Sequence, residues 1–96
     1  MKFVASRLSE GNKLFPSEII LEVSGIEIKI PGLLSSDTKF ISYDGISAVE
    51  INSPMIGFST ITIFHSGNKV TAHGFSKDDA KAVKDEIEKR KSKNRN

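Results

Sequence analysis

The chain has 96 residues, of which 38% are hydrophobic, so it is long enough to form one domain around a modest core. It contains no cysteine, which excludes disulfide bonds, thiolate metal sites and cysteine nucleophiles and fits a reducing compartment such as the cytoplasm. The net charge is +2, but residues 89–96 carry five positive charges, while residues 1–88 hold nine basic and twelve acidic residues. We therefore expect a mildly acidic domain over 1–88 and a basic C-terminal tail over 89–96, which argues against a nucleic-acid-binding domain surface.

The first third of the chain predicts three short strands. Residues 2–6 form the first, and residues 19–23 and 26–30 form a hairpin around the turn signal Ser24-Gly25. A two-residue loop at that turn creates three apolar cross-strand pairs: Val23 with Ile26, Leu21 with Ile28, and Ile19 with Ile30. We expect these pairs to form one buried face of a sheet.

The middle of the chain predicts a second hairpin. Residues 38–43 and 46–51 read as strands, and Asp44-Gly45 between them is a strong two-residue turn signal. In this register Ile41 lies opposite Ala48 and Phe40 opposite Val49, so both faces carry apolar side chains. Such a hairpin is either curved into a barrel or covered by another element or a second subunit.

The last third predicts a hairpin followed by a helix. Residues 59–65 alternate with period two, Ser66-Gly67 turns the chain, and residues 68–73 return with Ile63 opposite Val70 and Ile61 opposite Ala72. Ser76 is a good helix N-cap. The apolar stripe of the helix then consists of Ala80, Val83 and Ile87, which predicts packing on a sheet.

Four segments, taken in this order, resemble small bacterial pleckstrin-homology-like (PH-like) domains. They are Ile26-Glu27-Ile28 with Pro31-Gly32-Leu33-Leu34, the run from Ile41 to Ile51, Ile61-Thr62-Ile63 with Ser66-Gly67-Asn68, and Gly74-Phe75-Ser76-Lys77-Asp78-Asp79-Ala80. The resemblance covers roughly residues 2–90. It implies a split antiparallel β-barrel of about seven strands capped by one C-terminal α-helix, without enzymatic activity or a cofactor.

The resemblance does not carry a lipid site over to this chain. Eukaryotic relatives bind phosphoinositide head groups through basic residues at the first hairpin. Here the corresponding hairpin tip is flanked by Glu22 and Glu27, and we assign no lipid-binding residue to it.

The residues themselves predict no catalytic, metal-binding or cofactor-binding site. His65 and His73 fall on opposite faces of the last hairpin, without carboxylates at ligand spacing. No nucleophile elbow and no glycine-rich phosphate loop occurs in the sequence. The acidic pairs Asp78-Asp79 and Asp85-Glu86 read as a solvated helix face, so we expect a protein that is not an enzyme.

Two apolar loops are candidate interfaces, Leu33-Leu34 and Met55-Ile56. Each pair lies next to proline and glycine in polar surroundings. An exposed apolar tip indicates contact with a protein partner or a membrane. The alternative is that both loops fold back and cap the ends of the barrel, and the sequence leaves both readings open.

The basic tail has two readings as well. Its candidate contacts with an anionic surface are Lys89, Arg90, Lys91, Lys93 and Arg95. At about 1 kcal/mol per basic residue, the tail contributes at most about 5 kcal/mol near an acidic bilayer. That energy corresponds to a dissociation constant of about 0.1–1 mM and gives only weak, unspecific attachment. In the other reading the tail is a frayed, solubilising helix end, and deleting residues 89–96 should leave the melting temperature nearly unchanged.

We expect a cytoplasmic protein without a transmembrane segment. The apolar run at residues 3–5 is too short for a signal peptide, and the uncharged stretch 51–68 contains Pro54 and Gly57. The predicted function is a non-catalytic binding or scaffolding module. It would recognise a protein, or a second copy of itself, through a strand edge or the groove between the last strands and the helix. Peripheral attachment to an anionic membrane, through the basic tail and the apolar loops, is the alternative.

Overall fold

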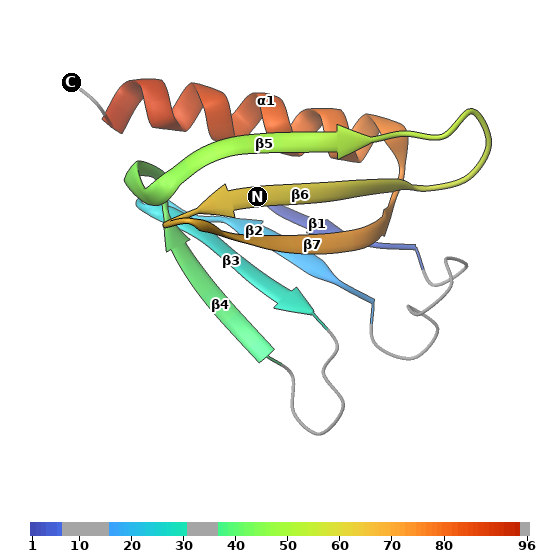
Figure 1. The fold of residues 1–96 in the computed structure, drawn as a ribbon, viewed down its shortest axis with the longest axis horizontal. Helices are drawn as coiled ribbons and strands as arrows, with labels where there is room; N and C mark the ends of the chain where they lie inside the picture. Colours follow the sequence, from blue (N-terminus) through green and yellow to red (C-terminus); the bar gives the residue numbers. More distant parts are fainter. Residues whose placement is uncertain (7–15, 31–36, 95–96) are drawn as a thin grey trace.

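The computed structural model describes residues 1–6, 16–30 and 37–94, and these residues form seven strands, one 3₁₀ turn and one long helix (Figure 1). The elements are β1 (Lys2–Val4), β2 (Glu18–Leu21), β3 (Gly25–Ile30), β4 (Asp37–Ser42), η1 (Tyr43–Gly45), β5 (Ile46–Asn52), β6 (Ser59–His65), β7 (Asn68–Phe75) and α1 (Lys77–Asn94).

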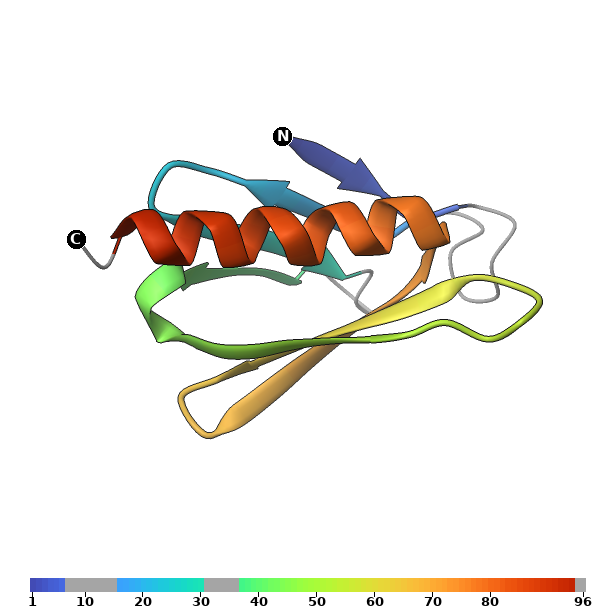
Figure 2. The ribbon, with the colours of Figure 1, turned by 90° about the horizontal axis from the view of Figure 1, so that it is seen from above.

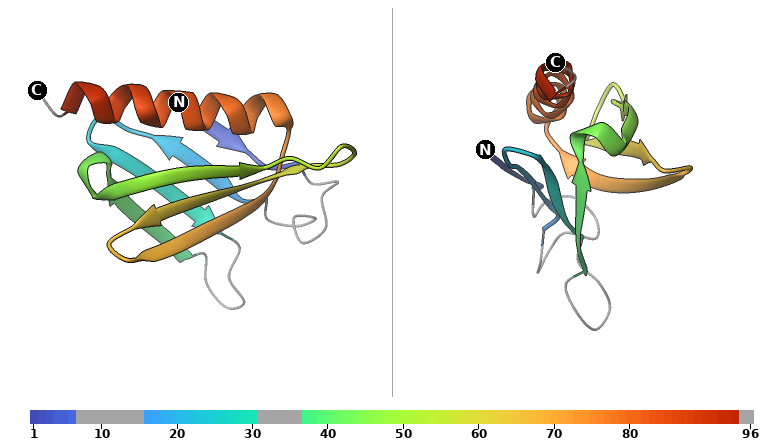
Figure 3. Two further views of the ribbon diagram at one scale, coloured as in Figure 1. Left: turned by 45° about the horizontal axis from the view of Figure 1, so that its top comes forward. Right: turned by 90° about the vertical axis from the view of Figure 1, so that its left-hand side faces the viewer.

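The strands make two antiparallel sheets, in the orders β1-β2-β3-β4 and β5-β6-β7. The expectation of a mainly β protein with one C-terminal helix is confirmed. In the described part of the chain the sheets stay separate, so a closed barrel is not confirmed (Figure 3). Near the end of β1 the two sheets meet, where the backbone N–H of Ser6 donates to the carbonyl oxygen of Gly74 at 2.8 Å.

The β6–β7 hairpin has the predicted register. Ile63 pairs with Val70 and Ile61 with Ala72. Ser66 and Gly67 both have positive φ, +49° and +78°, as a two-residue type I′ turn requires. The turn and the alternating side chains specify the same register, which explains why this hairpin is predictable from its sequence alone.

The β2–β3 hairpin differs from the prediction by two residues. Leu21 pairs with Ile26, not Ile28, and the turn is Val23-Ser24, so the side chain of Val23 is 91% exposed. Gly25 belongs to β3 rather than to the turn. A Cβ atom there would lie 2.4 Å from the carbonyl oxygen of Ile41 on β4. The glycine is therefore needed for close approach of the neighbouring strand, a reason that local turn signals do not reveal.

The predicted hairpin over 38–51 is wrong. β4 pairs with β3 and β5 pairs with β6, so the two strands belong to different sheets. The chain turns between the sheets through η1, where Tyr43 is completely buried. The apolar residues that the predicted hairpin placed on two faces belong to two different sheets. Ile41 faces the core from one sheet and Val49 from the other, whereas Phe40 is half exposed. Self-association through a two-sided hairpin therefore has no structural basis.

Helix α1 covers the opening between the two sheets and packs against η1, β5 and β6 (Figure 2). It begins as predicted, with the backbone N–H of Asp79 donating to Ser76 Oγ at 3.1 Å. The apolar stripe of Ala80, Val83 and Ile87 is fully buried, which confirms the predicted packing. The helix continues to Asn94, so residues 89–94 extend it beyond the predicted domain boundary.

Candidate functional site

The loop between β5 and β6, residues 53–58, projects beyond the sheets next to the start of α1 (Figures 1 and 2). We refer to it as the apolar loop. Met55 is 95% exposed and Ile56 91% exposed at its tip. This loop therefore does not fold back onto the core, and the exposed reading is correct for Met55 and Ile56.

The backbone of the apolar loop is braced by its surroundings. The hydroxyl oxygens of Ser53 and Ser59 lie 2.7 Å apart across its base, in a hydrogen bond. The Nζ of Lys77, the first residue of α1, donates to the carbonyl oxygen of Met55 at 3.1 Å. Gly57 has a φ of +111°, a backbone conformation that residues with a Cβ atom rarely adopt. The loop thus presents two apolar side chains from a backbone that is held in place.

The remaining predicted contact residues are distributed over other parts of the molecule. Leu33, Leu34 and Arg95 lie outside the described residues. Lys89, Lys91 and Lys93 lie on the last turns of α1, where Lys89 and Lys93 are exposed. Arg90, which was predicted together with them, is instead bound to the body of the protein.

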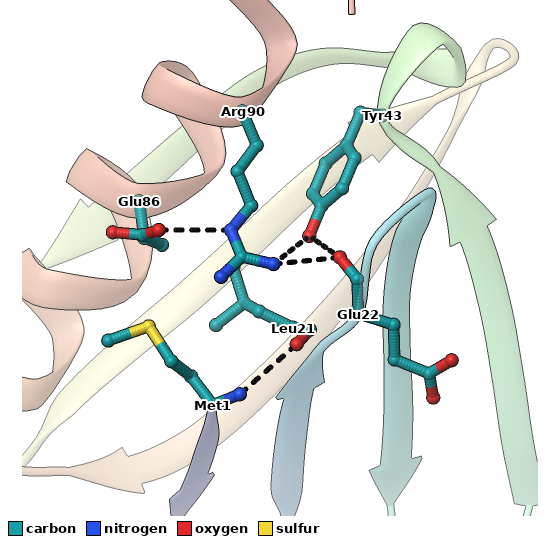
Figure 4. A network of polar contacts seen from close by, with 6 residues as sticks. All are labelled: Met1, Leu21, Glu22, Tyr43, Glu86 and Arg90. Carbon is teal, nitrogen blue, oxygen red and sulfur yellow. Dashed lines mark hydrogen bonds and ion pairs between the residues drawn. The ribbon is translucent and has the colours of Figure 1, made fainter. Parts of the chain in front are cut away.

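Arg90 joins three elements in a polar network (Figure 4). Its Nε donates to Glu86 Oε1 at 2.9 Å, and its Nη1 donates to the backbone carbonyl oxygen of Glu22 at 2.8 Å. The hydroxyl of buried Tyr43 donates to the same carbonyl oxygen at 2.6 Å. The network connects the end of α1 with η1 and with the β2–β3 turn. We call it the Arg90 network.

The charges of the Arg90 network stabilise each other. Hydrogen bonds with Glu86 and then with Tyr43 raise the pKa of Arg90 above its usual value. The hydrogen bond from Arg90 in turn lowers the pKa of Glu86. The Arg90 network was missed by sequence reasoning because Arg90 and Glu22 lie 68 positions apart in the chain.

The described basic residues of the tail and the apolar loop lie at opposite ends of α1. Lys77 contacts the apolar loop, whereas Lys93 lies about 24 Å further along the helix at a rise of about 1.5 Å per residue. The tail and the apolar loop therefore do not form one continuous surface patch. The membrane alternative drew on both features.

A second exposed apolar tip lies at the end opposite the apolar loop. Val23 at the β2–β3 turn is exposed to the same degree as Ile56, and the neighbouring Met1 is 61% exposed. Met1 is close because its amino group donates to the carbonyl oxygen of Leu21 at 3.2 Å. Sequence reasoning missed Val23 because the predicted register placed its side chain on the buried face.

Strand β5 leads directly into the apolar loop and, among the described residues, is an edge strand of its sheet with α1 packed beside it. Within the described residues it pairs along its other edge with β6, and a bulge lies at Ser47. Ser47, Ala48, Glu50 and Asn52 are exposed along β5. An edge strand presents unpaired backbone N–H and C=O groups to which an extended segment can bind. The β5 edge and the apolar loop therefore form one continuous candidate surface beside α1.

The histidines lie on opposite faces of the last hairpin, as predicted. His65 is buried on the core side, whereas His73 is exposed, with Nδ1 3.0 Å from Thr60 Oγ1. Among residues 1–6, 16–30 and 37–94, no three His, Asp or Glu side chains are placed to hold a metal ion together. Nor does this part of the chain contain a helix of the length and apolarity that crossing a membrane requires.

Comparisons of the chain with protein-family models, with curated proteins and with solved structures gave no match. Function therefore has to be inferred from the geometry of the described residues. The apolar loop and the β5 edge are the features that this geometry offers.

Proposed function

We propose that this protein is a non-catalytic binding module of PH-like architecture that recognises another protein through the apolar loop and the adjoining β5 edge. The observation that carries the proposal is the pair Met55 and Ile56, almost fully exposed on a braced backbone. The PH-like part of the proposal rests on the succession of four strands, three strands and a C-terminal helix.

The energy available from the tip explains why the β5 edge belongs to the proposed surface. Burying Met55 and Ile56 against a partner contributes about 1.5–3 kcal/mol for each side chain. Association itself costs an estimated 4–15 kcal/mol in lost translational and rotational freedom. The pair together contributes about 3–6 kcal/mol, which matches only the lower end of this cost. The proposed surface therefore includes the β5 edge, whose backbone groups would add hydrogen bonds to a partner.

The test compares two ends of the same molecule. Met55→Asp and Ile56→Asp alter the apolar loop, and Val23→Asp places the same charge at the equally exposed opposite end. Immobilised wild-type protein is used to capture partners, and each captured protein is purified and titrated against all variants. Loss of one buried apolar side chain weakens binding by about tenfold to a hundredfold.

We expect Met55→Asp and Ile56→Asp to weaken binding to this extent and Val23→Asp to leave it unchanged. Equal effects at both ends, or none at either end, would refute the proposal. All three variants should retain the wild-type melting temperature, because the substituted side chains are exposed. Unfolding of Met55→Asp would show instead that the apolar loop is part of the core.

A bilayer is a second candidate partner, favoured by the position of Lys77. Its ammonium group donates to the Met55 carbonyl oxygen, so a positive charge lies next to the backbone that carries the two apolar side chains. Co-sedimentation with anionic vesicles at low and high salt tests this candidate. Binding that Met55→Asp abolishes would support it, whereas absence of binding at both salt concentrations would remove it.

A further inference from the structure

We propose that Met55 is a reversible oxidation site through which peroxides switch the apolar loop from an apolar to a polar surface. The inference rests on the proposed function, because it assigns a regulatory input to the same loop. Its first requirement is that an oxidant reaches the thioether, and its second is that the resulting sulfoxide changes the surface without unfolding the protein.

The thioether of Met55 is accessible. Oxidation of methionine follows exposure, and Met55 is 95% exposed at the tip of a projecting loop. The chain contains no cysteine and no tryptophan, so its two methionines are its main oxidisable groups. The other methionine, Met1, is 61% exposed and lies at the opposite end of α1, which makes it an internal comparison.

The reaction is an oxygen-atom transfer. The sulfur of Met55 attacks one peroxide oxygen, an S–O bond forms, the O–O bond breaks, and water or an alcohol leaves. Sulfur loses two electrons and the peroxide gains two. The product, methionine sulfoxide, is polar and is returned to the thioether by methionine sulfoxide reductases, as two thiols are oxidised to a disulfide and the oxygen leaves as water.

The consequence is confined to the surface of the apolar loop. The bracing contacts use the Met55 carbonyl oxygen, Lys77 and the hydroxyl pair of Ser53 and Ser59, none of which is altered by oxidation of the side chain. Oxidation therefore leaves the loop backbone in place. It makes one of the two apolar side chains polar, leaving Ile56 alone at the tip.

The experiment treats the whole chain with hydrogen peroxide and follows each methionine by mass spectrometry. We expect Met55 to react within about threefold of the rate of N-acetylmethionine amide, as its exposure requires. The oxidised protein should keep its melting temperature and lose retention on a phenyl-agarose column. Treatment with the reductases should restore that retention.

Met55→Leu is the matched variant, because it keeps an apolar side chain of similar size that peroxide cannot oxidise. After the same treatment it should retain its column behaviour, which attributes the effect to Met55 rather than Met1. A rate more than tenfold below that of the free amide, or unchanged retention after oxidation, would overturn the inference. Both readouts are made without a partner, so failure of the proposed binding function is seen separately, in the titrations with Met55→Asp.

Discussion

Arg90→Ala tests whether the end of α1 stabilises the fold. The substitution removes the charged donor to the Glu22 carbonyl oxygen at 2.8 Å. Hydrogen bonds to charged groups contribute about 1.5–3 kcal/mol. The guanidinium is partly exposed to water, and the carbonyl oxygen keeps its 2.6 Å hydrogen bond from Tyr43, so we expect a loss of about 1–2 kcal/mol.

Such a loss is measurable in a domain of this size. At about 4–8 °C per kcal/mol, the melting temperature should fall by about 4–16 °C. The assay is thermal and urea unfolding followed by circular dichroism, with Lys89→Ala as the control, since Lys89 is the exposed preceding residue. We expect the control to lie within about 0.5 kcal/mol of wild type.

Tyr43→Phe completes a double-mutant cycle with Arg90→Ala. Both side chains bond the same carbonyl oxygen, so their effects should be coupled by about 0.5–3 kcal/mol rather than additive. The Arg90 network also predicts that deletion of residues 89–96 destabilises the protein, contrary to the expectation for a frayed tail. Equal stability of Arg90→Ala and Lys89→Ala would refute this reasoning.

Three further predictions concern packing and pH. Gly25→Ala should lower the free energy of unfolding by about 1–3 kcal/mol, because the added Cβ atom meets the backbone of β4. Gly45→Ala should lower it less, because the nearest neighbour of the added Cβ atom is a side-chain oxygen at 3.4 Å. Ile87→Ala should lower the free energy of unfolding by about 2–5 kcal/mol in urea denaturation, since this side chain of α1 is fully buried in the core; a smaller loss would mean that the helix does not close the core. The pKa of Glu22 is raised above 4.5, first by a hydrogen bond with Glu27 and then by partial desolvation and the charge of Glu27. The folded state therefore binds more protons just above pH 4.5, and the contribution of Glu22 to stability is lost as the pH rises through its folded pKa. Glu27→Gln should lower the pKa of Glu22 in an NMR titration of its carboxyl carbon, and an unchanged pKa would contradict the pairing.

The candidate surface was predictable in part. Met55 and Ile56 stand out in the sequence as two consecutive apolar residues between a proline and a glycine. Whether the pair is exposed or buried depends on where the loop lies relative to the rest of the fold, including Lys77 22 positions later, so it could not be decided from the loop itself. Arg90 shows the opposite case, because a side chain predicted to belong to a basic tail is hydrogen-bonded to the β2–β3 turn and to η1.

The elements that are specified by local residues could be predicted from the amino-acid sequence. The β6–β7 register follows from the Ser66-Gly67 turn and the alternation of its flanking residues, and the start and buried stripe of α1 follow from Ser76 and the helical period. The β2–β3 register, the separation of β4 from β5 and the placement of Arg90 became evident only from the folded protein. Each of these depends on a contact with a distant segment, namely close approach of β4 at Gly25, burial of Tyr43, and a shared carbonyl oxygen at Glu22. Hydrophobic periodicity and turn residues describe hydrogen bonding and side-chain direction along the chain, and they contain no information about which distant backbone or charged group a residue meets.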